Sequence, residues 1–265
     1  MLTSTIIHLQ AQANGHIAGS TARAIHGFWF QQWQNTAPVI ADTLHQSNQT
    51  QPYTLSPLMG LPRPHKGETA VAAKQTAWLR ITTLHTNITT PFLQNWLTRL
   101  PAAIELAGIP WAVQTIALSP AQHPLAAQTS YQELQATPPA AKWRLHLRTP
   151  TTFSAENDHF PFPLPYSLVN SWLRRWQTFA PTPLPIDDNF TTRLRQQLHI
   201  SAYDLKTVPV RHGRRLEIGC VGYITLNGHR LSPQDRATIT TLAAYAFYCG
   251  SGRHTTQGMG LTIAD

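Results

Sequence analysis

The sequence predicts an α+β protein made of two tandem ferredoxin-like domains, each with the element order βαββαβ. The main observation is that hydrophobic spacing indicates this order twice along the 265 residues. A second is the interval rich in Ala, Gln and Pro between the two runs of elements. A third is the apolar fraction of 42% with eight Trp, which argues against a disordered chain. We therefore expect a domain at residues 1–120, a linker at 121–140 and a second domain at 141–265.

The first half begins with a predicted strand at residues 2–11. A helix is predicted at 21–34, because four large apolar side chains fall on one helical face: Ile25, Phe28, Trp29 and Trp33. Pro38 in a first turn indicates a second, short helix at 37–46. Four further elements of the first half are predicted from a proline-bounded run, an alternating pattern and another apolar helical stripe. They are a strand at 52–58, a strand at 76–85, a helix at 87–100 and a strand at 112–118.

The second half shows the same order of elements without any matching sequence. A strand is predicted at 143–148 and an amphipathic helix at 166–179. Strands at 199–208 and 216–226 follow, then a helix at 232–248 and a last strand after Gly258. Each half is therefore a split βαβ pattern.

The charge balance favours an anionic partner. The formal net charge is +8 although only 12% of residues are charged, so the excess comes from scarce acidic residues. Such a field attracts a nucleic acid or an anionic membrane surface. No apolar run approaches the ~20 residues of a membrane helix, and residues 1–10 lack a signal-peptide pattern, so we expect a cytoplasmic protein. Cys220 and Cys249 are expected to be buried thiols, and no cysteine or histidine motif predicts a metal or other cofactor.

The strongest local signal is the glycine-rich loop, residues 250–260 (GSGRHTTQGMG). It follows a predicted helix, so it is neither a Rossmann fingerprint nor a P-loop. Its glycines would let the backbone approach a ligand and present N–H groups to an anion, while Arg253, Thr255 and Thr256 add donors. A flexible glycine turn with no ligand is the alternative.

This loop resembles the glycine-rich loop of the CRISPR precursor-RNA-processing endoribonucleases of the RAMP superfamily. Three further segments are similar in order and spacing. Thr43-Leu44-His45 with residues 52–58 (PYTLSPL) resembles that family's "LH…PFTxSPL" segment. Residues 163–176 resemble its second-domain helix, and residues 219–223 (GCVGY) resemble the strand before its last helix. The resemblance covers both halves and implies two ferredoxin-like, or RRM-like, domains.

The resemblance also implies a reaction and its partners. The reaction is RNA cleavage without a metal, in which the ribose 2′-hydroxyl attacks the adjacent phosphate and leaves a 2′,3′-cyclic phosphate and a 5′-hydroxyl. The implied partner is CRISPR repeat RNA, as precursor and as mature guide RNA. Other subunits of a CRISPR effector complex remain open as partners.

His45 stands where the family carries its catalytic histidine, and an imidazole can act as base or acid near neutral pH. Arg23 and His26 share a helix face with Phe30, so Arg23 could clamp the scissile phosphate and His26 could share the proton transfers. Ordinary surface or interfacial roles for all three remain open. Where some relatives have a tyrosine and a lysine, this chain has Phe30 and Gln51, so a catalytically lapsed RNA-binding subunit is the alternative function.

The remaining candidates are RNA-binding residues. The segment Arg211-His212-Gly213-Arg214-Arg215 indicates a basic hairpin tip, and Arg174 and Arg175 indicate a helix edge that faces RNA; solvated positions are equally open for both groups. The full expected set is Gly250, Gly252, Arg253, His254, Thr255, Thr256, Gly258, Gly260, Arg174, Arg175, Arg211, Arg214 and Arg215.

Overall fold

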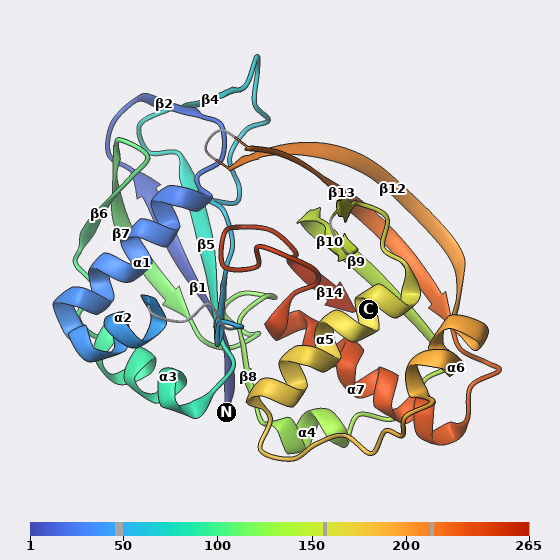
Figure 1. Cartoon of the computed structure of the whole chain (residues 1–265). Helices are drawn as coiled ribbons and strands as arrows, with labels where there is room; N and C mark the ends of the chain where they lie inside the picture. Colours follow the sequence, from blue (N-terminus) through green and yellow to red (C-terminus); the bar gives the residue numbers. More distant parts are fainter. Residues whose placement is uncertain (46–49, 156–157, 213–214, 265) are drawn as a thin grey trace. The chain divides into compact units, whose positions relative to one another are not determined.

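A computed structural model describes residues 1–45, 50–155, 158–212 and 215–264 (Figure 1). The chain divides into a first unit, Met1–Gln128 with Thr256–Gly258, and a second unit, Thr129–Thr255 with Met259–Asp265. Each unit holds an antiparallel sheet with helices packed on it. The predicted α+β class, with two ferredoxin-like folds in tandem, is therefore confirmed.

The first unit is built on the sheet β3-β5-β1-β7-β6. Its strands are β1 (Leu2–Ala11), β2 (Gly15–Ala18), β3 (Tyr53–Leu55), β4 (Glu68–Val71), β5 (Thr76–Thr83), β6 (Ala103–Leu106) and β7 (Ile109–Ala117). Its helices are α1 (Ala22–Thr36), α2 (Pro38–His45), α3 (Thr86–Pro91) and the π-helix η1 (Phe92–Trp96). The strands β3, β5, β1 and β7 lie in the ferredoxin-like order second, third, first, fourth.

Aromatic side chains form the centre of the first unit's core. Trp29 of α1 contacts Trp33, Tyr53, Phe92 and Trp96, with ring centroids 4.8 to 5.7 Å apart. Aromatic pairs at such distances add about 0.5–1.5 kcal/mol each beyond the burial of their area. The predicted apolar stripe of the first helix therefore fixes α1 against the sheet.

The helix predicted at 87–100 is divided by Pro91. The ring of Pro91 cannot supply a backbone N–H, so α3 ends there and η1 begins at Phe92. The amide of Leu97 then donates to the carbonyl of Phe92, which is the wider spacing of a π-helix.

The second unit is built on the sheet β12-β13-β9-β14, again in the order second, third, first, fourth. Its strands are β9 (Lys142–Thr151), β10 (Phe153–Ala155), β11 (Asp158–Phe160), β12 (His199–His212), β13 (Arg215–Asn227) and β14 (Thr262–Ala264). Its helices are α4 (Tyr131–Gln135), α5 (Pro165–Phe179), α6 (Phe190–Gln197) and α7 (Pro233–Cys249). Helices α5 and α7 pack together through Trp176 and Tyr245, whose ring centroids are 5.2 Å apart.

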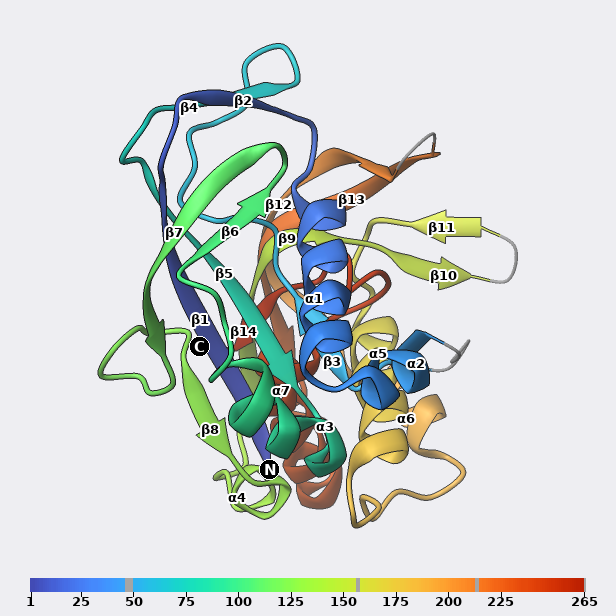
Figure 2. The same ribbon diagram turned by 90° about the vertical axis from the view of Figure 1, so that its left-hand side faces the viewer.

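Several short elements lie outside the sequence prediction. They are the β2–β4 ribbon, β6, the β10–β11 hairpin that projects in Figure 2, and α6. The interval 121–140, predicted as a linker, contains β8 (Ala127–Thr129) and α4. Ser130 and Glu133 form a capping box that begins α4. Residue 46, at the end of the predicted helix 37–46, lies outside the described residues.

Cys220 and Cys249 are both buried thiols, as predicted. Within the described ranges, no helix has the length and apolar character needed to cross a membrane.

Candidate functional site

In the first unit, two histidine rings contact one phenylalanine ring. His26 and Phe30 are four residues apart on α1, and their ring centroids are 4.9 Å apart. His45 ends α2, and its ring lies 3.9 Å from that of Phe30 at an interplanar angle of 30°. Phe30 is 8% exposed, so its ring is a fixed apolar support for both imidazoles.

The environments of the two imidazoles differ. His26 is half-buried, whereas His45 is exposed at the end of its helix. Burial, and secondly the like charge of His45, lower the pKa of His26 from its ordinary value. The lowered pKa favours the neutral form of His26, which can accept a proton.

Arg23 lies in the first turn of α1, three residues before His26, and its side chain is exposed. Within the described part of the chain it makes no ion pair. Its guanidinium is thus available to an anion on the side of α1 that carries His26.

Gln51 contacts the helix that presents His45. Its Nε2 donates to the carbonyl oxygen of Leu44 at 3.2 Å, and Leu44 is buried in the core. Position 51 therefore holds the last turn of α2, a role that the sequence did not indicate.

The backbone of the glycine-rich loop is used within the protein. The amides of Ser251, Arg253 and Gly260 donate to the carbonyl oxygens of Gly260, Thr152 and Pro150. The amide of Gly252 donates to Oγ of Ser171, and that of Gly258 to the carbonyl oxygen of Leu55. The predicted anion nest is wrong for these amides, because a donor that is already paired cannot bind a phosphate.

The glycines serve close packing of the chain on itself. Gly250, Gly252, Gly258 and Gly260 all have positive φ, which favours glycine. A Cβ on Gly252 would collide with the carbonyl oxygen of Thr152, and one on Gly260 with that of Ser251. The close approach that the sequence predicted therefore occurs, with the protein's own backbone as the neighbour.

The structure also contradicts the prediction that Arg175 lies on an RNA-facing helix edge. It was predicted on a solvated edge facing RNA, but it is 6% exposed. Its guanidinium donates to the carbonyl oxygens of Ser171 and Gly252 and to Oγ1 of Thr255. Arg175 therefore holds the glycine-rich loop from inside, and Thr255, expected to bind phosphate, is buried as its acceptor.

Other side chains of the loop remain accessible. Arg253, His254 and Thr256 are partly exposed, and Arg174 on α5 is exposed. Arg253 donates to Nδ1 of His159 at 2.6 Å, and Nε2 of His254 lies 3.0 Å from Oε1 of Glu217. Arg174 and Arg253 give the second unit accessible basic side chains beside the loop.

The basic hairpin tip is formed by β12 and β13, which pair as far as His212↔Arg215. Arg211 is exposed near its end. Arg214 lies outside the described residues, and Arg215 is described only as backbone. Among the side chains that the structure describes, no group of three or more His, Cys, Asp or Glu is placed to hold a metal ion.

The chain is similar to known proteins in part of its sequence and in its fold. Residues 145–262 match the family model of the CRISPR-associated endoribonuclease Cas6. A Thermus thermophilus Cas6 is 26% identical, with a TM-score of 0.78 over 100% of this chain and 98% of that one. A product complex of the same protein gives a TM-score of 0.84 over the full length of both chains. No curated protein sequence matches.

A more distant Cas6-related protein from Pyrococcus furiosus, at 14% identity, has the same fold with a TM-score of 0.68, covering 100% of this chain and 99% of that one. The family match lies in the unit that carries the glycine-rich loop, and the fold likeness extends over both units. Residues 145–262 are therefore similar to the family of the CRISPR-associated endoribonuclease Cas6, and the whole chain shares the fold of solved Cas6 structures.

Proposed function

We propose that this protein binds CRISPR repeat RNA and cleaves precursor transcripts by metal-independent acid–base catalysis. The 2′-hydroxyl attacks the adjacent phosphate, and the products carry a 2′,3′-cyclic phosphate and a 5′-hydroxyl. The match of residues 145–262 to the Cas6 family model and the likeness in fold to a Cas6 product complex and a Cas6 substrate mimic complex support this proposal. Processed guide RNA and other subunits of a CRISPR effector complex are its proposed partners.

The observation that carries the proposal is the His26–Phe30–His45 cluster. Cleavage requires a base that takes the proton of the 2′-hydroxyl while its oxygen bonds to phosphorus. It also requires an acid that protonates the 5′-oxygen as the bond from phosphorus to that oxygen breaks. The lowered pKa of His26 suits the base, and exposed His45 is then the acid.

Arg23 supplies the third chemical requirement. The negative charge on the phosphate oxygens grows in the transition state, and a guanidinium can donate two parallel hydrogen bonds to them. Arg23 is exposed on the first turn of the helix that carries His26. We place it on the scissile phosphate.

The proposed RNA-facing side chains around the glycine-rich loop are Arg174, Arg253, His254 and Thr256, together with Arg211 on the hairpin. All are at least partly exposed. The loop glycines and Arg175 shape this surface through their contacts within the protein.

His45→Ala tests the catalytic assignment. The single-turnover rate should fall by roughly 10² to 10⁴, because a positioned acid or base contributes that much. RNA affinity should change much less than the rate, since one exposed side chain makes few of the contacts that hold the RNA. His16→Ala, at an exposed histidine of β2, is the control and should cut at the wild-type rate. A His45→Ala protein that also cuts at that rate removes His45 from the mechanism.

A lapsed RNA-binding subunit is the second candidate, favoured by Phe30 and Gln51. A phenyl ring has no hydroxyl to donate a proton, and the Gln51 side chain contacts the Leu44 carbonyl and carries no charge. Tight binding of all-ribose repeat RNA without any cleavage by the wild-type protein supports this candidate.

A further inference from the structure

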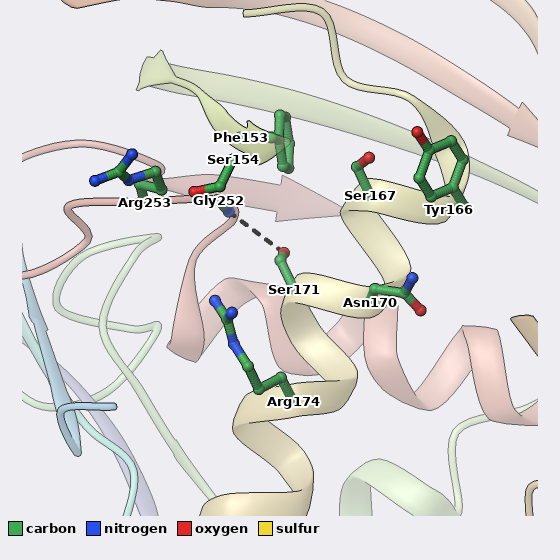
Figure 3. A pocket seen from close by; sticks show the side chains of 9 residues that line it. All are labelled: Phe153, Ser154, Tyr166, Ser167, Asn170, Ser171, Arg174, Gly252 and Arg253. Carbon is green, nitrogen blue, oxygen red and sulfur yellow. Dashed lines mark hydrogen bonds between the residues drawn. The ribbon is translucent and has the colours of Figure 1, made fainter. Parts of the chain in front are cut away.

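A polar cavity opens beside the glycine-rich loop in the second unit (Figure 3). Its walls come from β10, from α5 and from the loop itself, and its volume is about 180 Å³. Pockets for drug-sized ligands measure about 300–1,000 Å³, so this one suits a single planar ring and not a helical stem.

The wall carries hydrogen-bonding groups that the protein leaves unused. Ser154, Ser167 and Asn170 line the cavity, and none of the three makes a side-chain hydrogen bond to another described residue. A hydroxyl both donates and accepts, and a carboxamide offers two donors and one acceptor. The edge of a nucleobase presents the complementary pattern. Tyr166 also lines the cavity; the guanidinium of Arg195 lies 4.9 Å from the centroid of its ring, over one face, so a base would stack on the opposite face.

Arginines lie at the border of the same cavity. Arg174 extends from α5 toward the loop at Gly252, and Arg253 continues the positive charge along the loop (Figure 3). Both side chains are accessible to solvent. They are placed for the phosphates of an RNA strand whose base enters the cavity.

The cavity is preformed. Oγ of Ser171 accepts from the amide of Gly252, and Nε1 of Trp172 donates to Oγ of Ser251 at 2.8 Å. Arg175 donates to the carbonyl oxygen of Gly252 at 2.8 Å. Because α5 and the loop are joined before any ligand binds, little ordering opposes binding.

We propose that this cavity takes one unpaired base of the bound RNA, with Arg174 and Arg253 on the phosphates that flank it. Sequence-specific RNA recognition depends on bases that can leave the stack, so this pocket would read one position of the repeat. The inference rests on the proposed function, because it names the part of the repeat RNA that the second unit contacts.

The test is an abasic scan of the repeat RNA from the source's own CRISPR array, with single substitutions at its unpaired positions. For the wild-type protein, one position should lose about 5- to 100-fold in affinity, as removal of a stacked base does. Asn170→Ala should weaken binding of the intact RNA about tenfold and leave its affinity for that one abasic RNA unchanged. Such non-additive effects of Asn170→Ala and the abasic substitution indicate a base in the cavity. A general loss of binding would instead weaken the binding of both RNAs by the same factor.

Arg174→Ala gives the matching phosphate measurement. It should weaken binding of intact and abasic RNA by similar factors and reduce the slope of log affinity against log salt by about 0.7. Arg230→Ala changes an exposed arginine of the same unit outside the cavity. It should leave the RNA affinity and the salt slope unchanged.

The outcomes separate this inference from the proposed function. If the wild-type protein binds and cuts the repeat but no abasic position couples to Asn170→Ala, the cavity takes no base and the proposed function stands. If the wild-type protein does not bind the repeat, both proposals fail.

Discussion

Arg175 is a buried cation whose hydrogen bonds all go to oxygen atoms around the glycine-rich loop. It has no carboxylate partner among the described residues. Burial lowers the pKa of its guanidinium, which nevertheless stays protonated. Helical spacing could have found it: Arg175 follows Ser171 by one turn and Trp172 by three residues, on the buried face of α5.

Arg175→Lys tests whether this side chain holds the loop or only supplies charge. An ammonium lacks the planar fork, so we expect the free energy of unfolding to fall by about 1–3 kcal/mol. RNA affinity should fall as well, although the net charge is unchanged. Urea unfolding and gel shift give the two readings.

Arg174→Lys is the matched control, because it changes the neighbouring, exposed residue on the same helix. Its free energy of unfolding should stay within about 0.5 kcal/mol of wild type. Equal stability of both lysine variants contradicts the structural role of Arg175.

His26 and Phe30 could be placed together from sequence, because a spacing of four residues aligns them on one helix. The contact between Phe30 and His45 could not be predicted in this way. That contact depends on how α2 folds back on α1, which short-range spacing does not determine.

At the scale of elements, the glycine-rich loop shows what composition can and cannot predict. The glycines correctly indicate close backbone approach, since all four have positive φ. Composition cannot identify the neighbour, which for Gly252 is the carbonyl oxygen of Thr152. The same pattern therefore fits a ligand cradle and a tightly packed loop.

Gly252→Ala measures the packing contribution of the loop. Gly108→Ala is its control, because φ is +71° at Gly252 and +76° at Gly108, while only Gly252 has atoms within 4 Å of the added Cβ. We expect Gly108→Ala to lower the free energy of unfolding by about 1 kcal/mol, because of backbone strain alone. Gly252→Ala should cost about 2–4 kcal/mol and weaken RNA binding. Equal losses of stability in the Gly252→Ala and Gly108→Ala proteins would contradict close packing of the loop at Gly252.

At the scale of the whole molecule, the order of the main strands and helices was predictable in both units. Long apolar stripes and alternation specify those elements independently of their neighbours. Short elements were not predictable: β2 and β4 have four residues each, and β10 has three. Such segments form because a partner strand supplies their hydrogen bonds, and the local sequence does not record that partner.

The net charge of +8 favours the attraction of a polyanion such as RNA, but it does not explain the proposed cleavage. The central claim is that the nucleophile belongs to the substrate. A histidine can deprotonate the 2′-hydroxyl near neutral pH, and no metal-bound water is needed in this mechanism. Cleavage should then persist in excess chelator.

The most direct test replaces the single ribose on the 5′ side of the scissile phosphate by 2′-deoxyribose in the repeat RNA. This change removes the nucleophile and keeps every phosphate, so gel shift should show nearly unchanged binding. Cleavage at that bond should be lost, while the all-ribose RNA should yield 2′,3′-cyclic phosphate and 5′-hydroxyl ends. Cleavage of the deoxy-substituted RNA at the same bond contradicts the mechanism.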